Sequence, residues 1–153
     1  IKYNKKYTVS YLSIGEAEDY RWYWKKSWKR NKPKFLGEEN PEWKGNFKVK
    51  FWELEWQKII FKSLDRIIKN GYDGVYLDII DAYEYYEAKG YNFARKEMIN
   101  FVIKISKYAK RKKKNFLIIP QNGIELVEDD RYLSAIDGIG KEDTWYYDDE
   151  IKD

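Results

Sequence analysis

Short apolar runs that alternate with longer amphipathic stretches constrain the fold of this chain more than any other feature. The runs span residues 7–13, 74–78, 116–120 and, more weakly, 135–140, and they are nearly continuous and rich in β-branched or aromatic residues. Strands that are buried on both faces of a parallel sheet have this composition. The sequence therefore predicts four parallel strands.

The stretches between these runs have helical periodicity. Residues 55–69 carry apolar side chains at helical spacing and are followed by Asn70 and Gly71, a typical helix stop. Residues 92–112 repeat apolar side chains at a spacing near 3.6, and a short helix is expected within residues 124–133. Strands that alternate with helices, joined by right-handed crossovers, predict an α/β fold on a parallel sheet.

Composition limits the chemistry that this chain can perform. Its 153 residues suit one domain and include no Cys and no His. Disulfides, thiolate nucleophiles, Cys/His zinc sites and Ser-His-Asp triads are therefore excluded, and acid–base chemistry must fall to carboxylates, Tyr or Lys. The net charge of +4 is a mild basic balance with interspersed signs, which is not typical of nucleic-acid binding. No apolar run approaches the roughly 18 residues of a membrane-spanning helix.

Acidic and amide side chains follow each predicted strand. Because the carboxyl ends of parallel strands meet at one edge, where α/β folds build ligand sites, these residues predict one acidic basin. Polar loops that merely cap helices are the alternative explanation. The residues are Glu16 and Glu18 after the first strand, Asp78, Asp81 and Tyr83 after the second, Gln121 and Asn122 after the third, and Glu142 after the fourth.

The segment from residue 20 to residue 56 contains six tryptophans and separates the first strand from its helix. A loop of this length inside a compact domain is usually functional, so we expect an extended loop on the same face as the acids. Flat apolar rings beside acids and amides suit a sugar, whose ring faces are rich in C–H groups. A small aromatic cluster that pins the loop is the alternative.

Two carboxylates at strand ends suggest glycoside hydrolysis. Asp78 ends the second strand, and Glu142 follows the fourth. In such a pair one carboxyl group protonates the leaving oxygen, and the other attacks carbon or activates water. The acid would need a raised pKa, for which Glu16, Glu18 and Asp81 are candidate sources of negative field.

Other chemistries receive less support from the sequence. The acids could hold Ca²⁺ or Mg²⁺, but no EF-hand spacing is present, and we expect no metal. No glycine-rich phosphate loop follows a strand. The basic run at residues 110–114 falls at a predicted helix end, where a solvated cationic terminus explains it better than nucleic-acid binding.

Several motifs resemble glycoside-hydrolase family 114 TIM barrels, the group similar to endo-polygalactosaminidases. Residues 11–18 (YLSIGEAE) resemble the family's third strand, residues 40–57 its loop and following helix, and residues 71–83 its fourth strand. Residues 121–123 and 137–143 resemble the ends of its fifth and sixth strands. The matches occur in the family's order over nearly the whole chain.

The resemblance implies a (β/α)8 TIM barrel, of which this chain would be a central portion of about four βα units. The family's first two and last two strands have no counterpart here, since a full barrel takes about 250 residues. The single partial domain would span residues 1–153. Its exposed sheet edges predict a tendency to self-associate.

The resemblance also implies a function. Asp78 and Glu142 match the family's catalytic carboxylates, and the implied substrate is an amino-sugar polysaccharide, galactosamine-rich, handled without a cofactor. An extracellular or cell-envelope location follows from the resemblance alone. A saccharide-binding module that has lost catalysis is the competing hypothesis. The residues expected to bind substrate are Tyr11, Ser13, Glu16, Glu18, Asp81, Tyr83, Gln121 and Asn122.

Overall fold

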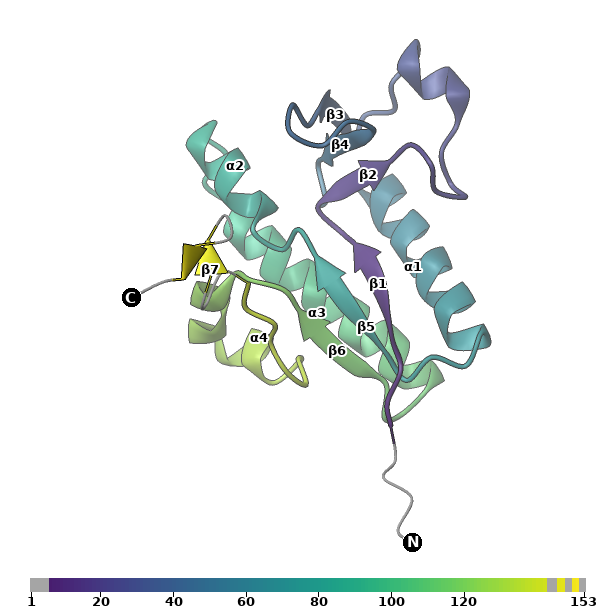
Figure 1. The fold of residues 1–153 in the computed structure, drawn as a ribbon, viewed down its shortest axis with the longest axis vertical. Helices are drawn as coiled ribbons and strands as arrows, with labels where there is room; N and C mark the ends of the chain where they lie inside the picture. The colour runs from purple at the N-terminus through teal and green to yellow at the C-terminus, as the bar shows by residue number, and fades with distance from the viewer. Residues whose placement is uncertain (1–5, 143–145, 148–149, 152–153) are drawn as a thin grey trace, which may run out of the picture.

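A parallel three-stranded sheet forms the centre of the molecule in a computed structural model, which describes residues 6–142, 146–147 and 150–151. The strand order is β1 (Val9–Ser13), β5 (Gly74–Asp78) and β6 (Leu117–Pro120). All three strands point the same way, so their carboxyl ends share one rim (Figure 1). The predicted α/β fold with a parallel sheet is confirmed.

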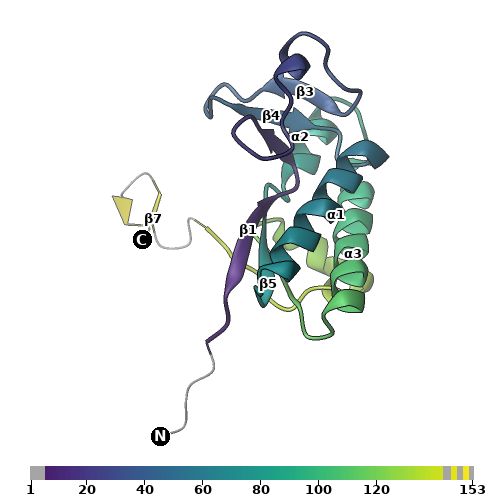
Figure 2. The same cartoon turned by 90° about the vertical axis from the view of Figure 1, so that its right-hand side faces the viewer.

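Helices α1 (Leu54–Lys69) and α3 (Ala94–Lys112) cover one face of this sheet (Figure 2). Both lie close to their predicted ranges, and α1 ends at Asn70 and Gly71, the latter with a φ of +88°. Apolar side chains of both helices and of one strand face make the core. They are Trp56, Ile60 and Leu64 of α1, Met98, Phe101, Val102 and Ile105 of α3, and Leu12, Val75, Leu77 and Ile118 of the sheet.

The tryptophan-rich segment is not the extended loop that the sequence predicted. It supplies a short 3₁₀ helix, η1 (Lys26–Lys29), and the strands β3 (Leu36–Glu39) and β4 (Asn46–Val49). These strands join the preceding β2 (Glu16–Glu18) in a second, antiparallel sheet of order β2, β4, β3. In β4 the buried Phe47 and Val49 alternate with the more exposed Asn46 and Lys48. This two-residue period is the signal of a half-buried strand.

The expected fourth strand at residues 135–140 is not formed. The segment runs beside β6 and makes one parallel bridge, between Gln121 and Gly140. The Asp137 amide also donates to the Ile118 carbonyl at 2.8 Å. Its glycines at 138 and 140 explain the lost regularity, because glycine weakens strands.

The remaining elements are short helices and one pair of short strands. Helix α2 (Ala82–Ala88), which the sequence analysis did not predict, follows β5 directly. The short helix expected within residues 124–133 forms as a 3₁₀ turn, η2 (Ile124–Glu128), and a single turn, α4 (Asp130–Leu133). Strands β7 (Tyr146–Tyr147) and β8 (Glu150–Ile151) pair antiparallel. No closed barrel is present within the described part of the chain.

Candidate active site

A groove of about 550 Å³ opens at the rim formed by the carboxyl ends of the parallel strands. Strands β1, β2, β4 and β5 contribute side chains, as does the chain that follows β6. Six of the ten residues predicted from the sequence line it. They are Tyr11, Glu16, Glu18, Asp78, Gln121 and Glu142.

Asp78 is held at the end of β5 by an unusual backbone. The next residue, Ile79, has a φ of +58°, a left-handed conformation that is costly for a β-branched side chain. This turn brings the Ile79 amide within 2.8 Å of Asp78 Oδ1, to which it donates. Gly15 permits the turn, because a Cβ at Gly15 would lie 2.2 Å from the Ile79 carbonyl oxygen.

Two tyrosines flank Asp78 on the same sheet face. The Tyr11 hydroxyl donates to Asp78 Oδ2 at 2.6 Å, and burial together with this hydrogen bond raises the pKa of Tyr11 far above its usual range. Tyr76 lies directly opposite Tyr11 in the β1–β5 register. Burial, Glu142 and Asp78 raise the pKa of Tyr76 above its usual value.

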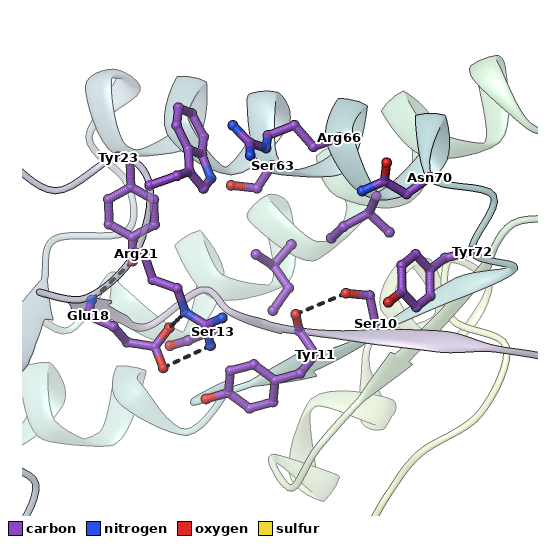
Figure 3. A pocket seen from close by; sticks show the side chains of 13 residues that line it. Ser10, Tyr11, Ser13, Glu18, Arg21, Tyr23, Ser63, Arg66, Asn70 and Tyr72 are labelled. Atoms are coloured by element: carbon purple, nitrogen blue, oxygen red, sulfur yellow. Dashed lines mark hydrogen bonds and ion pairs between the residues drawn. The ribbon is translucent and has the colours of Figure 1, made fainter.

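Glu18 and Arg21 form a charged pair at the end of the groove beside β1 (Figure 3). The buried Glu18 carboxylate accepts from Arg21 Nε at 2.5 Å and Nη2 at 3.2 Å, and from the Tyr20 hydroxyl. Tyr11, Glu18 and Arg21 also line a second cavity of about 210 Å³ between β1 and α1. The pair therefore lies between the two cavities.

Glu16 is the second buried acid of the groove. Its Oε1 accepts from Lys48 Nζ at 2.7 Å and from Asn40 Nδ2 at 2.9 Å, and its Oε2 accepts from Asn46 Nδ2 at 3.4 Å. All three partners come from the antiparallel sheet and its β3–β4 turn. Glu16 is therefore held by partners within its own sheet, and its charge is balanced by Lys48.

Glu142 is exposed at the opposite side of the groove from Glu18 and Arg21, beyond β5 and β6. Its backbone amide donates to Asn122 Oδ1 at 3.2 Å, which is how Asn122 contributes although it does not line the groove. Gly140 allows the chain before Glu142 to pass close to Tyr76, because a Cβ at Gly140 would lie 2.2 Å from the Tyr76 hydroxyl oxygen. Asp143, which the family resemblance included, lies outside the described residues.

Three predicted binding residues do not reach the groove. Ser13 is buried and its Oγ donates to the Glu16 carbonyl at 3.1 Å, which closes the turn between β1 and β2. Tyr83 is fully buried in the core, and its hydroxyl contacts Glu84 and Glu125. Asp81 is half-buried at the start of α2, where burial, Glu84 and Asp78 raise its pKa.

The tryptophans divide between the two explanations that the sequence allowed. Trp28 and Trp56 are buried, and the Trp56 indole donates to the Ile14 carbonyl at 2.8 Å, so these rings fix the segment to the core. Trp43 is 66% exposed and lines the groove, as a ring that binds a ligand would. Trp22 is exposed beside the second cavity.

Six groove residues were not identified from the sequence: Tyr20, Arg21, Trp43, Asn46, Tyr76 and Ile79. Tyr76 had a usable signal, because residues two apart on a strand share a face and Tyr76 precedes Asp78 by two. Arg21, Trp43 and Asn46 reach the rim only through the antiparallel sheet, which local patterning did not reveal.

The described residues offer little for a metal ion, a membrane or a nucleic acid to bind. Within the described ranges, no three acidic side chains are grouped as a metal site, and no helix has the length and apolarity to cross a membrane. The basic run is partly neutralised, since Lys110 contacts Asp137 at 2.8 Å, Lys112 contacts Asp65 at 2.6 Å and Lys113 contacts Asp73 at 3.1 Å.

Comparison with protein families gives a match over almost the whole sequence. The model of glycoside-hydrolase family GH114 matches residues 1–152. The chain belongs to this family. Membership of GH114 agrees with the acidic rim and supports a glycoside hydrolase-like function.

Three curated GH114-like relatives are uncharacterised proteins. The chain is 51% identical over 147 residues to one from Methanocaldococcus jannaschii, 46% over 143 residues to one from Thermotoga maritima and 44% over 142 residues to one from Deinococcus radiodurans. These matches cover 92%, 90% and 93% of this chain, respectively, but only 42%, 44% and 46% of the relatives. The chain therefore spans less than half the length of these relatives.

Two solved glycoside hydrolases share the fold. Aspergillus fumigatus Ega3, determined in complex with galactosamine, superposes with a TM-score of 0.72 at 20% identity and covers 89% of this chain and 50% of its own. The glycoside hydrolase domain of Pseudomonas aeruginosa PelA gives 0.65 at 15% identity, with 88% and 49% covered. Both likenesses establish the fold of the matched part.

Proposed function

We propose that this chain carries the catalytic carboxylates of a glycoside hydrolase that cleaves an amino-sugar polysaccharide, with Asp78 and Glu142 as the pair. The observation that carries the proposal is that both carboxylates line one groove, together with Tyr76. One carboxyl group would protonate the glycosidic oxygen, while the other attacks the anomeric carbon or activates a water molecule.

The charges of the groove support a cationic sugar at the cleavage point. Glu16 is already paired with Lys48, and Glu18 with Arg21. Asp78 and Glu142 have no ion-pair partner among the described residues, so they are the acids left to attract an ammonium group. The complex of the related Ega3 with galactosamine supports an amino sugar of that type.

The aromatic residues of the groove support an extended saccharide. Trp43 is 66% exposed and Tyr20 is 65% exposed, although both line the groove. Large exposed rings beside polar groups are suited to stacking on sugar faces. Gln121, which is buried, follows β6 and lines the same groove, and it would orient a hydroxyl or amino group.

Turnover of galactosamine oligomers by the full-length protein tests the proposal. Asp78→Asn and Glu142→Gln should each lower kcat by about 100-fold or more, as expected for the loss of a catalytic carboxyl group. Asp130→Asn and Glu128→Gln are matched controls, because both side chains are exposed and remote from the groove, and they should retain activity within about twofold.

Two outcomes would overturn this assignment. Equal activity in the wild type and in both carboxylate variants would remove the pair. Calorimetric binding of the oligomer without any hydrolysis by the wild type would favour a saccharide-binding module that uses Trp43 and Tyr20. Assays with acetylated and deacetylated oligomers would show whether the substrate needs a free amino group. This question is independent of which carboxylates act.

We further propose that the chain is the central portion of a barrel whose remaining strands belong to other parts of the same full-length protein. Support comes from β1, which pairs only with β5 among the described residues, and from Tyr11 and Val9 on the open sheet face, which are 42% and 38% exposed. In the full-length protein, amides of residues 9–13 should exchange as slowly as those of β5. Fast exchange, or slow exchange that appears only on dimerisation, would contradict completion within one chain.

A further inference from the structure

Arg21 has no part in the carboxylate pair, yet its environment is unusually well defined. Among the described residues that line the groove it is the one cation. Its Nε and Nη2 contact the two Glu18 oxygens at 2.5 and 3.2 Å. A two-point contact with a carboxylate fixes the plane of a guanidinium group as well as its position.

The fixed guanidinium contacts two aromatic rings. Its Cζ lies 5.4 Å from the centre of the Tyr11 ring and 5.2 Å from that of the Tyr20 ring, both within the range of cation–π attraction. Glu18, which anchors it, is only 3% exposed and has its own amide bonded to the Tyr23 hydroxyl at 3.0 Å. The anchor therefore cannot move without disturbing β2.

Tyr11 is the point where this cluster meets the reacting groups. Its ring is 42% exposed on the open face of β1, so the sheet alone does not restrict its rotamers. Its hydroxyl nevertheless donates to Asp78 Oδ2 at 2.6 Å. Figure 3 shows the Tyr11 ring beside the Glu18–Arg21 pair rather than packed against α1.

We propose that Arg21 is a positioning residue: anchored by Glu18, it holds the Tyr11 ring so that the Tyr11 hydroxyl fixes the Asp78 carboxylate. The catalytic consequence rests on the proposed function, whereas the geometric link from Arg21 through Tyr11 to Asp78 does not. Arg21 acts through Tyr11, so its loss should affect the chemical step more than substrate binding.

A double-mutant cycle on the full-length protein measures the link. Arg21→Lys keeps the charge but loses the planar face, and it should lower kcat about 10- to 100-fold with KM changed less than about twofold. Tyr11→Phe should cause a similar loss, and the double variant should be no worse than Tyr11→Phe alone. Arg66→Lys is the matched control, because Arg66 lies over the Trp22 ring at 4.9 Å and outside the groove, and its kcat should stay unchanged.

A second readout needs no activity. In wild-type protein the carbon-13 signal of Tyr11 Cζ, assigned with Tyr11→Phe, should not move up to about pH 11, because burial, Asp78, Glu18 and Tyr20 all raise the pKa of Tyr11. In folded Arg21→Lys protein a Tyr11 ring released to solvent should begin to titrate below that pH. Arg66→Lys protein should behave as the wild type.

The kinetic cycle and the carbon-13 titration together distinguish the proposed hydrolase function from the positioning role of Arg21. If the wild type hydrolyses no amino-sugar oligomer but the Tyr11 signal responds to Arg21→Lys, the proposed function fails and the positioning role stands. If the wild type is active, additive kcat losses or an unmoved Tyr11 signal overturn the positioning role. A raised KM with unchanged kcat would also overturn it, since Arg21 would then bind substrate directly.

Discussion

The two faces of the parallel sheet differ in what their side chains contact: one face packs against helices, and the other lines the groove. On the face toward α1 and α3, Val75 and Leu77 are fully buried (Figure 2). On the other face, Tyr76 and Asp78 of the same strand are half-buried and line the groove. Because strand side chains alternate, core residues occupy the odd positions and groove residues the even positions 76 and 78 of one five-residue segment.

The largest expected effect on stability belongs to the helix-facing side. Leu77→Ala should lower the free energy of unfolding by about 2–5 kcal/mol, because it removes buried contacts and leaves a cavity among α1 and α3 side chains. Denaturant unfolding of the full-length protein measures this value. The matched change on the open face, Tyr76→Phe, should cost less than about 1 kcal/mol, since it removes only a half-exposed hydroxyl.

Equal losses from Leu77→Ala and Tyr76→Phe would contradict this division of the two faces. Such a result would mean that the open face is itself covered in the full-length protein and packed as tightly as the core. The comparison therefore also tests the proposal that further strands cover this face in the full-length protein.

A smaller, pH-dependent effect is expected at Asp81, which lies just behind the groove. Burial, Glu84 and Asp78 raise the pKa of Asp81 above its ordinary 3.8. Its contribution to stability is therefore greatest below about pH 4 and is lost as the pH rises through the folded-state pKa, because the buried charge is then unfavourable. Asp81→Asn should raise the melting temperature by about 2 °C at pH 7 and by nothing measurable near pH 3.

Thermal unfolding of both proteins across this pH range checks the sign. A gain from Asp81→Asn that is equal at both pH values would show that hydrogen bonding, not charge burial, sets the environment of Asp81. A lower melting temperature of the Asp81→Asn protein at pH 7 would indicate that the Asp81 carboxylate has a stabilising partner in the full-length protein.

The sequence predicted the fold where strong local periodicity coincided with burial. Strand β5 and helix α1 were found within a residue of their limits, because the apolar runs and the Asn70-Gly71 stop act locally. The antiparallel sheet was missed because its three strands have only three or four residues each, and because β2 pairs with β4 across a long separation, as between Ala17 and Phe47. The strand expected at residues 135–140 failed because two glycines interrupt it.

The site residues, too, could be predicted only where the local sequence fixes their position. Polar residues at a strand end or directly after one, such as Asp78 and Gln121, could be placed at the rim because the strand end fixes their position. Tyr83 could not, because α2 begins at Ala82 and turns the Tyr83 side chain into the core. Arg21 could not either: it lies only ten residues from Tyr11, but its contacts with Tyr11 and Glu18 depend on the turn between β1 and β2, which the local pattern does not specify.

The smallest effect is expected on the outer surface, at the basic end of α3. Lys110 pairs with Asp137 at 2.8 Å while both side chains stay about 30% exposed, so Lys110→Gln should cost no more than about 0.5 kcal/mol. Because exposed pairs are screened, the difference from the wild type should vanish in about 1 M salt, whereas the Leu77→Ala loss should persist. Denaturant unfolding at low and high salt separates the two. A salt-resistant loss at Lys110 would instead indicate that its hydrogen bond to the Ala135 carbonyl, at 3.4 Å, anchors the segment beside β6.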